Sequence, residues 1–423
     1  MDASLLIIGA GPAGLWAAWT AARHKPPGGI LVVDRLDAPG IKLAVTGGGR
    51  GNLSHLATEG EFTAAFGRNG RFTLPAFRAL PPDKLRADLA HIGIPSKVDA
   101  EGRVYPTSQS ASQVRDALAT ACERTGVRFL FNHRVTRLVP PNGPGQLWHA
   151  DALSARMVLL AAGGQSAATL GSDGSGFALA KAAGYDIVTP VPALVSLHTV
   201  EKWPAEHSGL SLPEVEIHLA GMHKAKHQER GALLFTHHGI SGPAVLNLSG
   251  FVARLLAEGK PVGLELALPG EKPDFQQLRH AAGTRTVLTW LAGRIPRTLA
   301  RTVLHLSGIQ PEQTFARLTI SQIQVLSRNL SALPLTISGT GGFAESMATS
   351  GGVSLKQVHP ETLEGRLLSG LFFAGEILNL DGPTGGWNLH WAFCSGHLAG
   401  TRAAQAAGPG FSPCAGSAQH LCS

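Results

Sequence analysis

Three glycines near the start of the chain have the spacing of a dinucleotide-binding turn. Gly9, Gly11 and Gly14 form a GxGxxG pattern. In such a turn the first glycine allows a tight bend, the second lets the backbone approach a pyrophosphate, and the third lets a helix pack closely on a strand. The helix N-terminus then offers unpaired N–H groups to the phosphates. Asp34 lies twenty residues after Gly14, where a carboxylate can accept both ribose hydroxyls.

The segments around this pattern predict the elements that would position it. Residues 4–9 form a continuous apolar run, as expected of a strand buried on both faces. Residues 15–23 read as a helix, and residues 30–33 as a second buried strand that ends at Asp34. GxGxxG alone is a weak signal and does not distinguish NAD from FAD, but the complete strand–turn–helix–strand unit predicts a bound dinucleotide.

Several further segments carry a resemblance to a known family. Residues 40–52 read GIKLAVTGGGRGN, residues 370–376 read GLFFAGE, and residues 381–389 read DGPTGGWNL. Shorter matches lie at residues 105–108, 160–164, 171–176 and 234–243. In this order, from residue 4 to about 402, they resemble the HI0933-like (YhiN/BaiN-like) FAD-dependent oxidoreductases.

The resemblance implies an α/β fold with one non-covalently bound FAD and oxidoreductase activity. The FAD-binding domain would have a Rossmann-like parallel sheet, with a first part at residues 1–190 and a second part at 340–407. Residues 158–164 and 371–376 read as further strands beside the cofactor, and residues 387–406 as a closing helix whose N-terminal amides face the flavin. The residues expected to bind FAD are Gly9, Gly11, Pro12, Ala13, Gly14, Asp34, Arg35, Lys42, Thr46, Gly48, Gly49, Arg50, Asn52, Val135, Ala162, Gly163, Gly164, Gly375, Glu376, Asp381, Thr384, Gly385, Gly386, Trp387, Asn388 and Leu389.

The middle of the chain reads as an inserted substrate or cap domain over residues 191–339. Short alternating runs in residues 195–240 predict antiparallel strands of a barrel or sheet. Residues 274–308 read as helical with a break at Pro296, and residues 311–337 as a return toward the sheet. Residues 408–423 are small and polar, so we expect a flexible tail.

One residue departs from the family pattern where chemistry would occur. Many members have Cys after Gly-Gly-Gly-Arg, but this chain has Gly51. A proton donor must therefore be sought elsewhere, and we select His237, His238 and Tyr105 as candidate catalytic residues. The loops at 46–52 and 381–388 and the segment at 235–243 are expected to meet at the reaction site.

Composition limits the remaining choices. The formal net charge of +7 and pI of about 9.5 permit an anionic partner without identifying one. Four cysteines without metal-ligand spacing and no long apolar run favour a cytoplasmic protein, with no disulfide scaffold, signal peptide or membrane span. Six histidines between residues 207 and 238, including His223 and His227, lack the spacing of a metal site, so we expect no metal.

The substrate and the electron donor stay open at this level. The first alternative is an oxidoreductase acting on a small molecule. The second is an RNA-modifying flavoprotein that reduces uridine to dihydrouridine in structured (ribosomal) RNA, and the third is a flavoprotein whose flavin is structural or regulatory. An acid-free stretch with five arginines at residues 275–311 could serve RNA or simply be solvated. With one dinucleotide pattern, NAD(P)H would dock transiently beside the flavin, or electrons would come from the substrate or a protein donor. The oligomeric state is not predicted.

Overall fold

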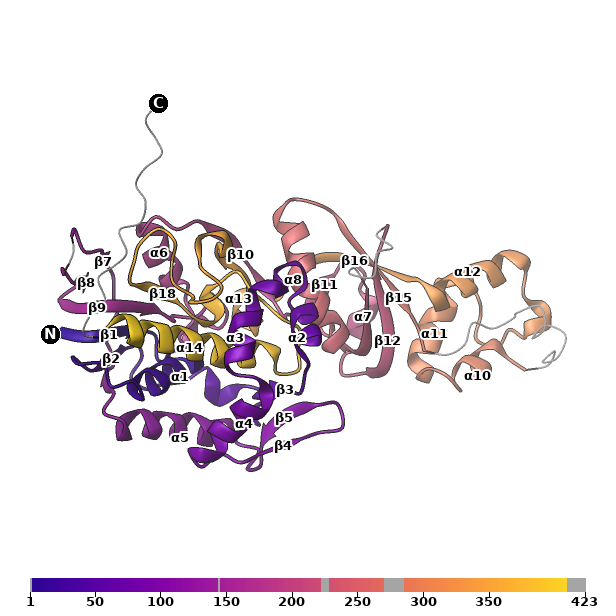
Figure 1. The fold of residues 1–423 in the computed structure, drawn as a ribbon. Helices are drawn as coiled ribbons and strands as arrows, with labels where there is room; N and C mark the ends of the chain where they lie inside the picture. Colours follow the sequence, from indigo (N-terminus) through magenta and orange to yellow (C-terminus); the bar gives the residue numbers. More distant parts are fainter. Residues whose placement is uncertain (1, 144, 222–227, 270–284, 409–423) are drawn as a thin grey trace. The chain divides into compact units, whose positions relative to one another are not determined.

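The computed structural model describes residues 2–143, 145–221, 228–269 and 285–408. These residues form two compact units. The first unit lies within Met1–Pro190 and Ala348–Ser423, and the second, here called the insert unit, within Val191–Met347. The chain thus leaves the first unit and returns to it (Figure 1).

The first unit is built on a seven-stranded sheet in the order β6-β2-β1-β9-β8-β7, with β18 also paired to β9. Its strands β1, β2, β6, β9 and β18 run parallel, whereas β8 is antiparallel to both of its neighbours, β9 and β7. The bounds of the seven strands are β1 Asp2–Ile8, β2 Ile30–Val33, β6 Arg128–Leu130, β7 Leu138–Val139, β8 Trp148–Ala150, β9 Leu153–Leu160 and β18 Leu371–Phe373.

Helices and two small sheets complete this unit. The α-helices are α1 Pro12–Ala22, α2 Glu59–Ala65, α3 Leu74–Ala79, α4 Pro82–His91, α5 Ala111–Arg124, α6 Ser175–Ala182 and α14 Trp387–Ala406. The 3-10 turns are η1 Leu43–Val45, η2 Gly67–Thr73, η3 Ala168–Leu170, η6 Leu355–Gln357 and η7 Gly375–Ile377. One small sheet has the order β3-β5-β4 (Ser54–His55, Arg103–Pro106, Ser96–Val98), and another pairs β10 Ile187–Ala193 with β17 Ala348–Val353.

The helix that follows the glycine turn is buried on all sides. Residues 13–21 of α1 are all buried, as expected of an apolar helix inside a core. The long helix α14 lies beside it (Figure 1). A Cβ atom added to Gly396 would lie 2.3 Å from the carbonyl oxygen of Ala13, and one added to Gly400 would lie 2.5 Å from that of Ala17. These two glycines therefore let the backbones of α14 and α1 come into contact.

The insert unit contains a closed barrel in the order β11-β14-β13-β12-β15-β16 and a group of helices. The strands are β11 Leu197–Thr199, β12 Ser211–Leu219, β13 Gln228–Thr236, β14 Gly239–Ser241, β15 Val262–Ala267 and β16 Leu333–Thr340. The helices are α7 Trp203–Glu206, α8 Pro243–Ala257, α10 Val287–Leu291, α11 Arg297–Leu306, the 3-10 turn η5 Phe315–Arg317, α12 Ile320–Ser331 and α13 Gly342–Glu345.

The predicted fold class is confirmed, with local corrections. The first helix begins at Pro12 rather than at residue 15, because proline suits the first turn of a helix. The strands expected at 158–164 and 371–376 end at Leu160 and Phe373, where the backbone turns into loops. The break at Pro296 falls between α10 and α11.

Two corrections concern the insert unit. Residues 311–337 do not return directly to the sheet, because Thr319 caps an amphipathic helix, α12, before β16 begins. The compact unit also extends to Met347, beyond the predicted end at 339. The Met347 N–H donates a hydrogen bond to Leu194 O, and Ser196 Oγ donates one to the Glu345 carboxylate, so this segment is held to the insert unit. The expected flexible tail lies outside the described residues after position 408.

Candidate flavin site

The three glycines of the GxGxxG turn differ in how much space surrounds them. A Cβ on Gly9 would lie 2.4 Å from Ala161 O, and a Cβ on Gly14 would lie 1.9 Å from Gly9 O, so these two positions are closed by the protein itself. A Cβ on Gly11 would have no atom within 4 Å. Gly11 begins α1 as its N-cap, with no side-chain cap. The open space at Gly11, beside the first turn of α1, fits a pyrophosphate.

Asp34 lies at the end of β2, next to this turn. Its carboxylate accepts hydrogen bonds from the Ala10 N–H at 2.7 Å and from the Leu36 N–H at 2.9 Å. These two bonds fix the direction of the carboxylate. One of them connects the carboxylate to the glycine turn, so the orientation of Asp34 and the shape of that turn depend on each other.

A cavity lies beside Asp34 on the nucleotide side of the sheet. Its lining residues are Ile8, Gly9, Val33, Asp34, Arg35, His133, Arg134, Val135, Ala162, Gly171, Ser175 and Leu179. Four predicted FAD-binding residues that are distant in sequence therefore converge here, namely Gly9, Asp34, Val135 and Ala162. Arg35, a fifth predicted residue, lines it as well. The combination of apolar side chains and charged groups in this lining suits the adenosine end of FAD.

Two arginines of this lining, Arg35 and Arg134, form ion pairs with Asp173. Asp173 lies 2.6 Å from Arg134 Nη2 and 3.3 Å from Arg35 Nε. Burial would raise the pKa of Asp173, but hydrogen bonds from Ser175 and Arg134, with the charge of Arg35, lower it to about 2. The carboxylate therefore stays ionised at neutral pH. Sequence interpretation missed Asp173 and Arg134, although Asp173 lies in the recognised GSDGSG segment.

The two glycine-rich loops meet at the N-terminus of α14. The Asn52 amide bridges them when it is oriented so that both of its polar atoms are satisfied: its nitrogen then donates to Ser54 O at 3.1 Å and its oxygen accepts from Gly386 N–H at 3.2 Å. Gly386 has φ +99°, and a Cβ there would lie 2.4 Å from Ser54 O, so only glycine fits between the two loops. Asn388 folds the second loop, accepting from Gly382 N–H at 2.8 Å and donating to Gly382 O at 2.8 Å.

His55 joins this meeting point and was missed by the sequence interpretation. Its Nδ1 lies 3.3 Å from Gly385 O, and its ring stacks on that of Trp387 with centroids 4.5 Å apart and planes at 16°. The preceding residue, Ser54, has its Oγ 2.8 Å from Nδ1 of His390, while Nε2 of His390 lies 2.9 Å from Leu80 O. Burial lowers the pKa of His390 to about 4, so this ring is neutral and links β3 to α14.

Lys42 and Glu376 bind one another rather than remaining free. Lys42 Nζ lies 2.9 Å from Glu376 and 2.6 Å from Ser166 Oγ. Glu376 also accepts from Ser166 Oγ at 3.0 Å and from the Thr349 N–H at 2.7 Å. A Cβ on Gly164 would lie 2.3 Å from Thr349 Oγ1. This network connects the loops that follow β2, β9 and β18, which are the loops expected to surround the cofactor.

Helix α14 also holds Gly375, which follows β18. The Gly375 N–H donates to Ser395 Oγ at 2.9 Å, and its carbonyl accepts from Trp391 Nε1 at 3.2 Å. A Cβ on Gly375 would lie 2.8 Å from the Cβ of Ala13. A Cβ on Gly163, in the loop after β9, would lie 2.8 Å from Ser172 Oγ. The peptides at these two glycines are thus fixed by close packing.

The conformation of the loop at 46–52 explains why glycine suits position 51. Gly51 has φ +76°, and a Cβ there would lie 3.2 Å from Ala111 Cα, so a side chain would be strained and crowded. Its neighbour Arg50 lies over the ring of Tyr105, 5.2 Å from the centroid. Nothing within 4 Å would meet a Cβ on Gly48 or Gly49, and Thr46 Oγ1 donates to Leu43 O at 2.8 Å.

The three candidate catalytic residues are divided between the units. Tyr105 is buried on β5 of the first unit, under Arg50. His237 and His238 lie at the turn between β13 and β14 of the insert unit, where the His238 ring is 5.3 Å from that of His198. Their meeting at one reaction site stays a prediction. Within the described residues no group of three His, Cys, Asp or Glu side chains could hold a metal ion, and His223 and His227 lie outside them.

Comparison with known proteins identifies the family to which this site belongs. Residues 3–402 match the HI0933-like protein Rossmann domain. The chain belongs to this HI0933-like family. It is therefore an FAD-dependent oxidoreductase, and the open space at Gly11, the cavity lined by Asp34 and the joined glycine loops fit that cofactor.

Two relatives and one solved structure show what this chain is similar to. The chain is 32% identical over 409 residues to a 3-dehydro-bile acid delta(4,6)-reductase of Clostridium scindens, covering 94% of this chain and 98% of the relative. It is 27% identical over 403 residues to a ribosomal RNA dihydrouridine synthase of Haemophilus influenzae, covering 93% and 96%. In fold it resembles a 3-ketosteroid delta1-dehydrogenase of Sterolibacterium denitrificans, at 13% identity and a TM-score of 0.53, covering 96% and 100%.

The chain offers no helix for a membrane within the part that the structure describes. None of these helices is both long enough and apolar enough to cross a bilayer.

The two cysteines described, Cys122 and Cys394, are buried and free. Burial raises the pKa of both thiols, which makes them packing groups rather than nucleophiles.

Proposed function

We propose that this protein reduces a carbon–carbon double bond conjugated with a carbonyl group in a small organic substrate. The names of both relatives describe such chemistry, since a 3-dehydro-bile acid with delta(4,6) unsaturation and a uracil ring each present a conjugated carbonyl. The observation that carries the proposal is the junction of the Asn52 and Gly386 loops at the N-terminus of α14. It supports a rigid, positively polarised end of a helix where the flavin ring would lie.

The residues of the chain would have two tasks in this reaction. FAD, when bound and reduced, supplies a hydride to the electron-poor carbon of the double bond. The first-turn amides of α14 would stabilise negative charge on the isoalloxazine, and the fixed loops would keep that geometry from relaxing. A side chain must then deliver a proton to the neighbouring carbon. Tyr105, His237 and His238 remain our candidates, because Gly51 provides no thiol.

The electron donor belongs to the same proposal. We infer that NAD(P)H docks transiently beside the flavin, since the sequence contains one GxGxxG unit and the pocket at Asp34 suits the flavin cofactor. A cytoplasmic location, where NAD(P)H is available, is part of this proposal. Anaerobic mixing with NADH or NADPH tests it, because loss of the oxidised flavin absorbance reports electron transfer directly.

The acceptor is tested with matched compounds. The FAD-bound protein is reduced without oxygen and mixed with cyclic enones and dienones, including 3-oxo steroids, and with the corresponding saturated ketones. We expect the conjugated compounds to reoxidise the flavin and the saturated ketones to leave it reduced. Tyr105→Phe should slow this step if Tyr105 delivers the proton. Equal reoxidation by both classes, or by neither, would contradict the proposed reaction.

A second candidate function is reduction of uridine in structured RNA. The observation in its favour is a basic face on the helices of the insert unit. From residue 285 to 331 Glu312 is the one acidic residue, against six arginines. On α11 the exposed positions Arg297, Arg301 and His305 follow one another at four-residue spacing. Arg279, another arginine of the predicted basic stretch, lies outside the described residues.

Mapping dihydrouridine decides between the two candidates. Ribosomal and transfer RNA from a strain lacking the gene are compared with RNA from its parent. Loss of one site, restored by the wild-type gene but not by an Arg285/Arg294/Arg301→Glu variant, would support the RNA function. Identical modification in both strains would leave the small-molecule reduction as the function.

A further inference from the structure

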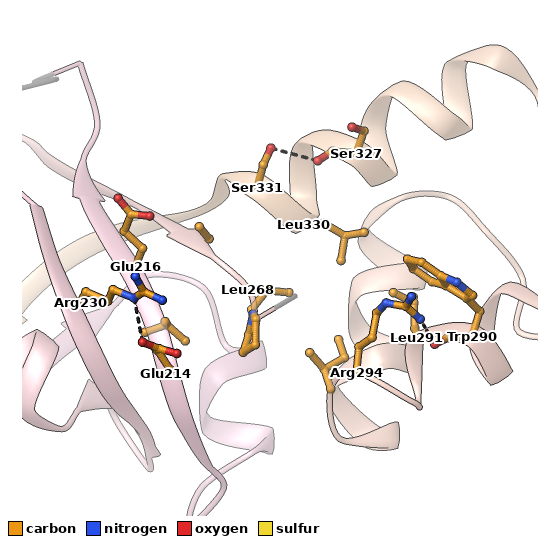
Figure 2. A pocket seen from close by; sticks show the side chains of 14 residues that line it. Glu214, Glu216, Arg230, Leu268, Trp290, Leu291, Arg294, Ser327, Leu330 and Ser331 are labelled. Carbon is orange, nitrogen blue, oxygen red and sulfur yellow. Dashed lines mark hydrogen bonds and ion pairs between the residues drawn. The ribbon is translucent and has the colours of Figure 1, made fainter. Parts of the chain in front are cut away.

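A cavity of about 300 Å³ lies inside the insert unit, between the barrel and the helices. Strands β12 and β13 form one wall with Glu214, Glu216 and Arg230, and the helical wall carries Trp290 and Arg294 (Figure 2). The cavity is further lined by the apolar side chains Val215, Leu268, Leu291, Ile295 and Leu330 and by the hydroxyls of Ser327 and Ser331.

The helical wall presents a flat, charged surface to this cavity. The guanidinium carbon of Arg294 lies 3.7 Å from the centroid of the Trp290 ring, and its Nη1 donates to Trp290 O at 3.3 Å. Figure 2 shows Arg294 lying against Trp290. Trp290 is 4% exposed, so the arginine is supported from behind by a buried ring. A guanidinium held in this way offers its second face for stacking with a planar heteroaromatic group.

The opposite wall offers hydrogen-bond acceptors on two carboxylates, each of which lies beside a basic side chain. Glu214 is paired with Arg230 at 2.7 Å, and Glu216 lies 3.1 Å from His218. These carboxylates can still accept from an N–H group at the edge of a base. Their negative charge makes this wall unsuited to a phosphate, so a phosphate would lie on the helical side of the cavity.

The helical side has the charge that a phosphate backbone requires. Arg297 lies three residues beyond Arg294, and Arg301 and His305 continue its exposed stripe along α11. The other face of α11 is buried through Leu299 and Val303. The stripe is therefore fixed in direction by the core beneath it. A stacking surface with a basic track beside it is the arrangement by which proteins hold single-stranded nucleic acid.

We propose that this cavity binds one unstacked base of an RNA strand, stacked on the Arg294 guanidinium, with the adjoining phosphates on the α11 stripe. This inference rests on the second candidate function and names the place where the insert unit would hold the RNA. All residues involved belong to the insert unit, and binding requires no reduced flavin. RNA binding can therefore fail while flavin reduction of a small acceptor succeeds, and the reverse.

The test uses the full-length, FAD-bound protein without a reductant. Binding of a fluorescent, uridine-rich single-stranded RNA is measured against the same strand in a duplex, with uridine monophosphate as a competitor. The main variant is Arg294→Lys, which keeps the charge and loses the planar stack. The matched control is Arg317→Lys, an exposed arginine of the same unit outside the cavity. Trp290→Phe serves as a second variant if Arg294→Lys lowers thermal stability.

We expect the single strand to bind more tightly than the duplex, and Arg294→Lys to weaken it about five- to one-hundred-fold, the range for loss of one base stack. Arg317→Lys should bind like the wild type. Arg297→Glu with Arg301→Glu should reduce the slope of log affinity against log salt by about 0.7 for each phosphate that the protein no longer neutralises. Equal affinity of Arg294→Lys and wild type, or equal binding of duplex and single strand, would overturn the proposal. So would binding of the mononucleotide without binding of RNA.

Discussion

The sharpest prediction concerns two glycines of the same turn that differ in the space around them. A methyl group added at Gly14 would lie 1.9 Å from Gly9 O, so Gly14→Ala must displace α1 from the sheet. A methyl group added at Gly11 would meet no protein atom within 4 Å, and its φ of −74° suits alanine. The first substitution should therefore act on the fold, and the second on the ligand.

The magnitudes follow from these contacts. Gly11→Ala gains about 0.4–1 kcal/mol because alanine restricts the unfolded chain, and loses a similar amount because alanine is a poor N-cap. The stability of the FAD-free protein should therefore change by less than about 1 kcal/mol. Its methyl group would occupy the space for the pyrophosphate and interrupt charge-assisted hydrogen bonds that contribute about 1.5–3 kcal/mol each, which corresponds to a ten- to one-hundred-fold loss of FAD affinity. Gly14→Ala should lower the free energy of unfolding by about 1–3 kcal/mol, the usual cost of overpacking a core.

The assay compares both variants with and without cofactor. Urea unfolding of the FAD-free proteins gives stability, and titration of FAD followed by flavin fluorescence gives affinity. Unchanged FAD affinity of Gly11→Ala would refute a pyrophosphate at this turn. Equal destabilisation of the two FAD-free variants would refute the difference in space between the two glycines.

Three further predictions address the neighbouring contacts. Asp34→Ala should weaken FAD binding by about 1–3 kcal/mol, and unchanged affinity in the titration would reject its ribose role. His55→Ala removes a ring that stacks on Trp387 and contributes about 0.5–1.5 kcal/mol, so FAD should bind up to about tenfold more weakly and the flavin absorbance should shift. His55→Phe should restore the stack. Equal FAD affinity and absorbance of the two variants would contradict this. Because burial lowers the pKa of His390 to about 4, the unfolded chain binds the proton more readily, and the free energy of unfolding should rise between about pH 4 and 6.5 by up to about 3 kcal/mol. His390→Asn should lose that part of the pH dependence measured by urea unfolding, and an unchanged slope would show that His390 does not cause it.

Local patterns allowed the glycine turn, its flanking elements and the closing helix to be predicted from sequence. The apolar run before Gly9 predicts strand β1, and Asp34 follows directly after the apolar run of β2. Both predictions succeed because the pattern and the element occupy the same short stretch of chain. The start of α14 was predicted equally well, since the helix begins at a glycine loop. The helix α12 was missed, although Thr319 and Gln322 form a capping box that predicts its start.

The side-chain partners could not be predicted in the same way. Lys42 and Glu376 are both polar residues of recognised segments, and nothing in either segment indicates that they bind each other. His55 depends on Trp387, which lies more than three hundred positions along the chain, so its role appears only when β3 and α14 are adjacent. Contacts of this kind are set by topology and packing rather than by local pattern.

The pairing of β10 with β17 has a consequence for the inserted segment. The two strands bring the ends of the inserted segment side by side, with Gly351 packed against Thr189 and Pro190. The entropic cost of closing a chain between two adjacent ends rises only slowly with the length of the insertion, by about 0.6 kcal/mol for each doubling. We therefore expect changes in the length of the insert unit to alter the chain-closure cost for the first unit only slightly, since the β10–β17 pairing holds the two crossing points together.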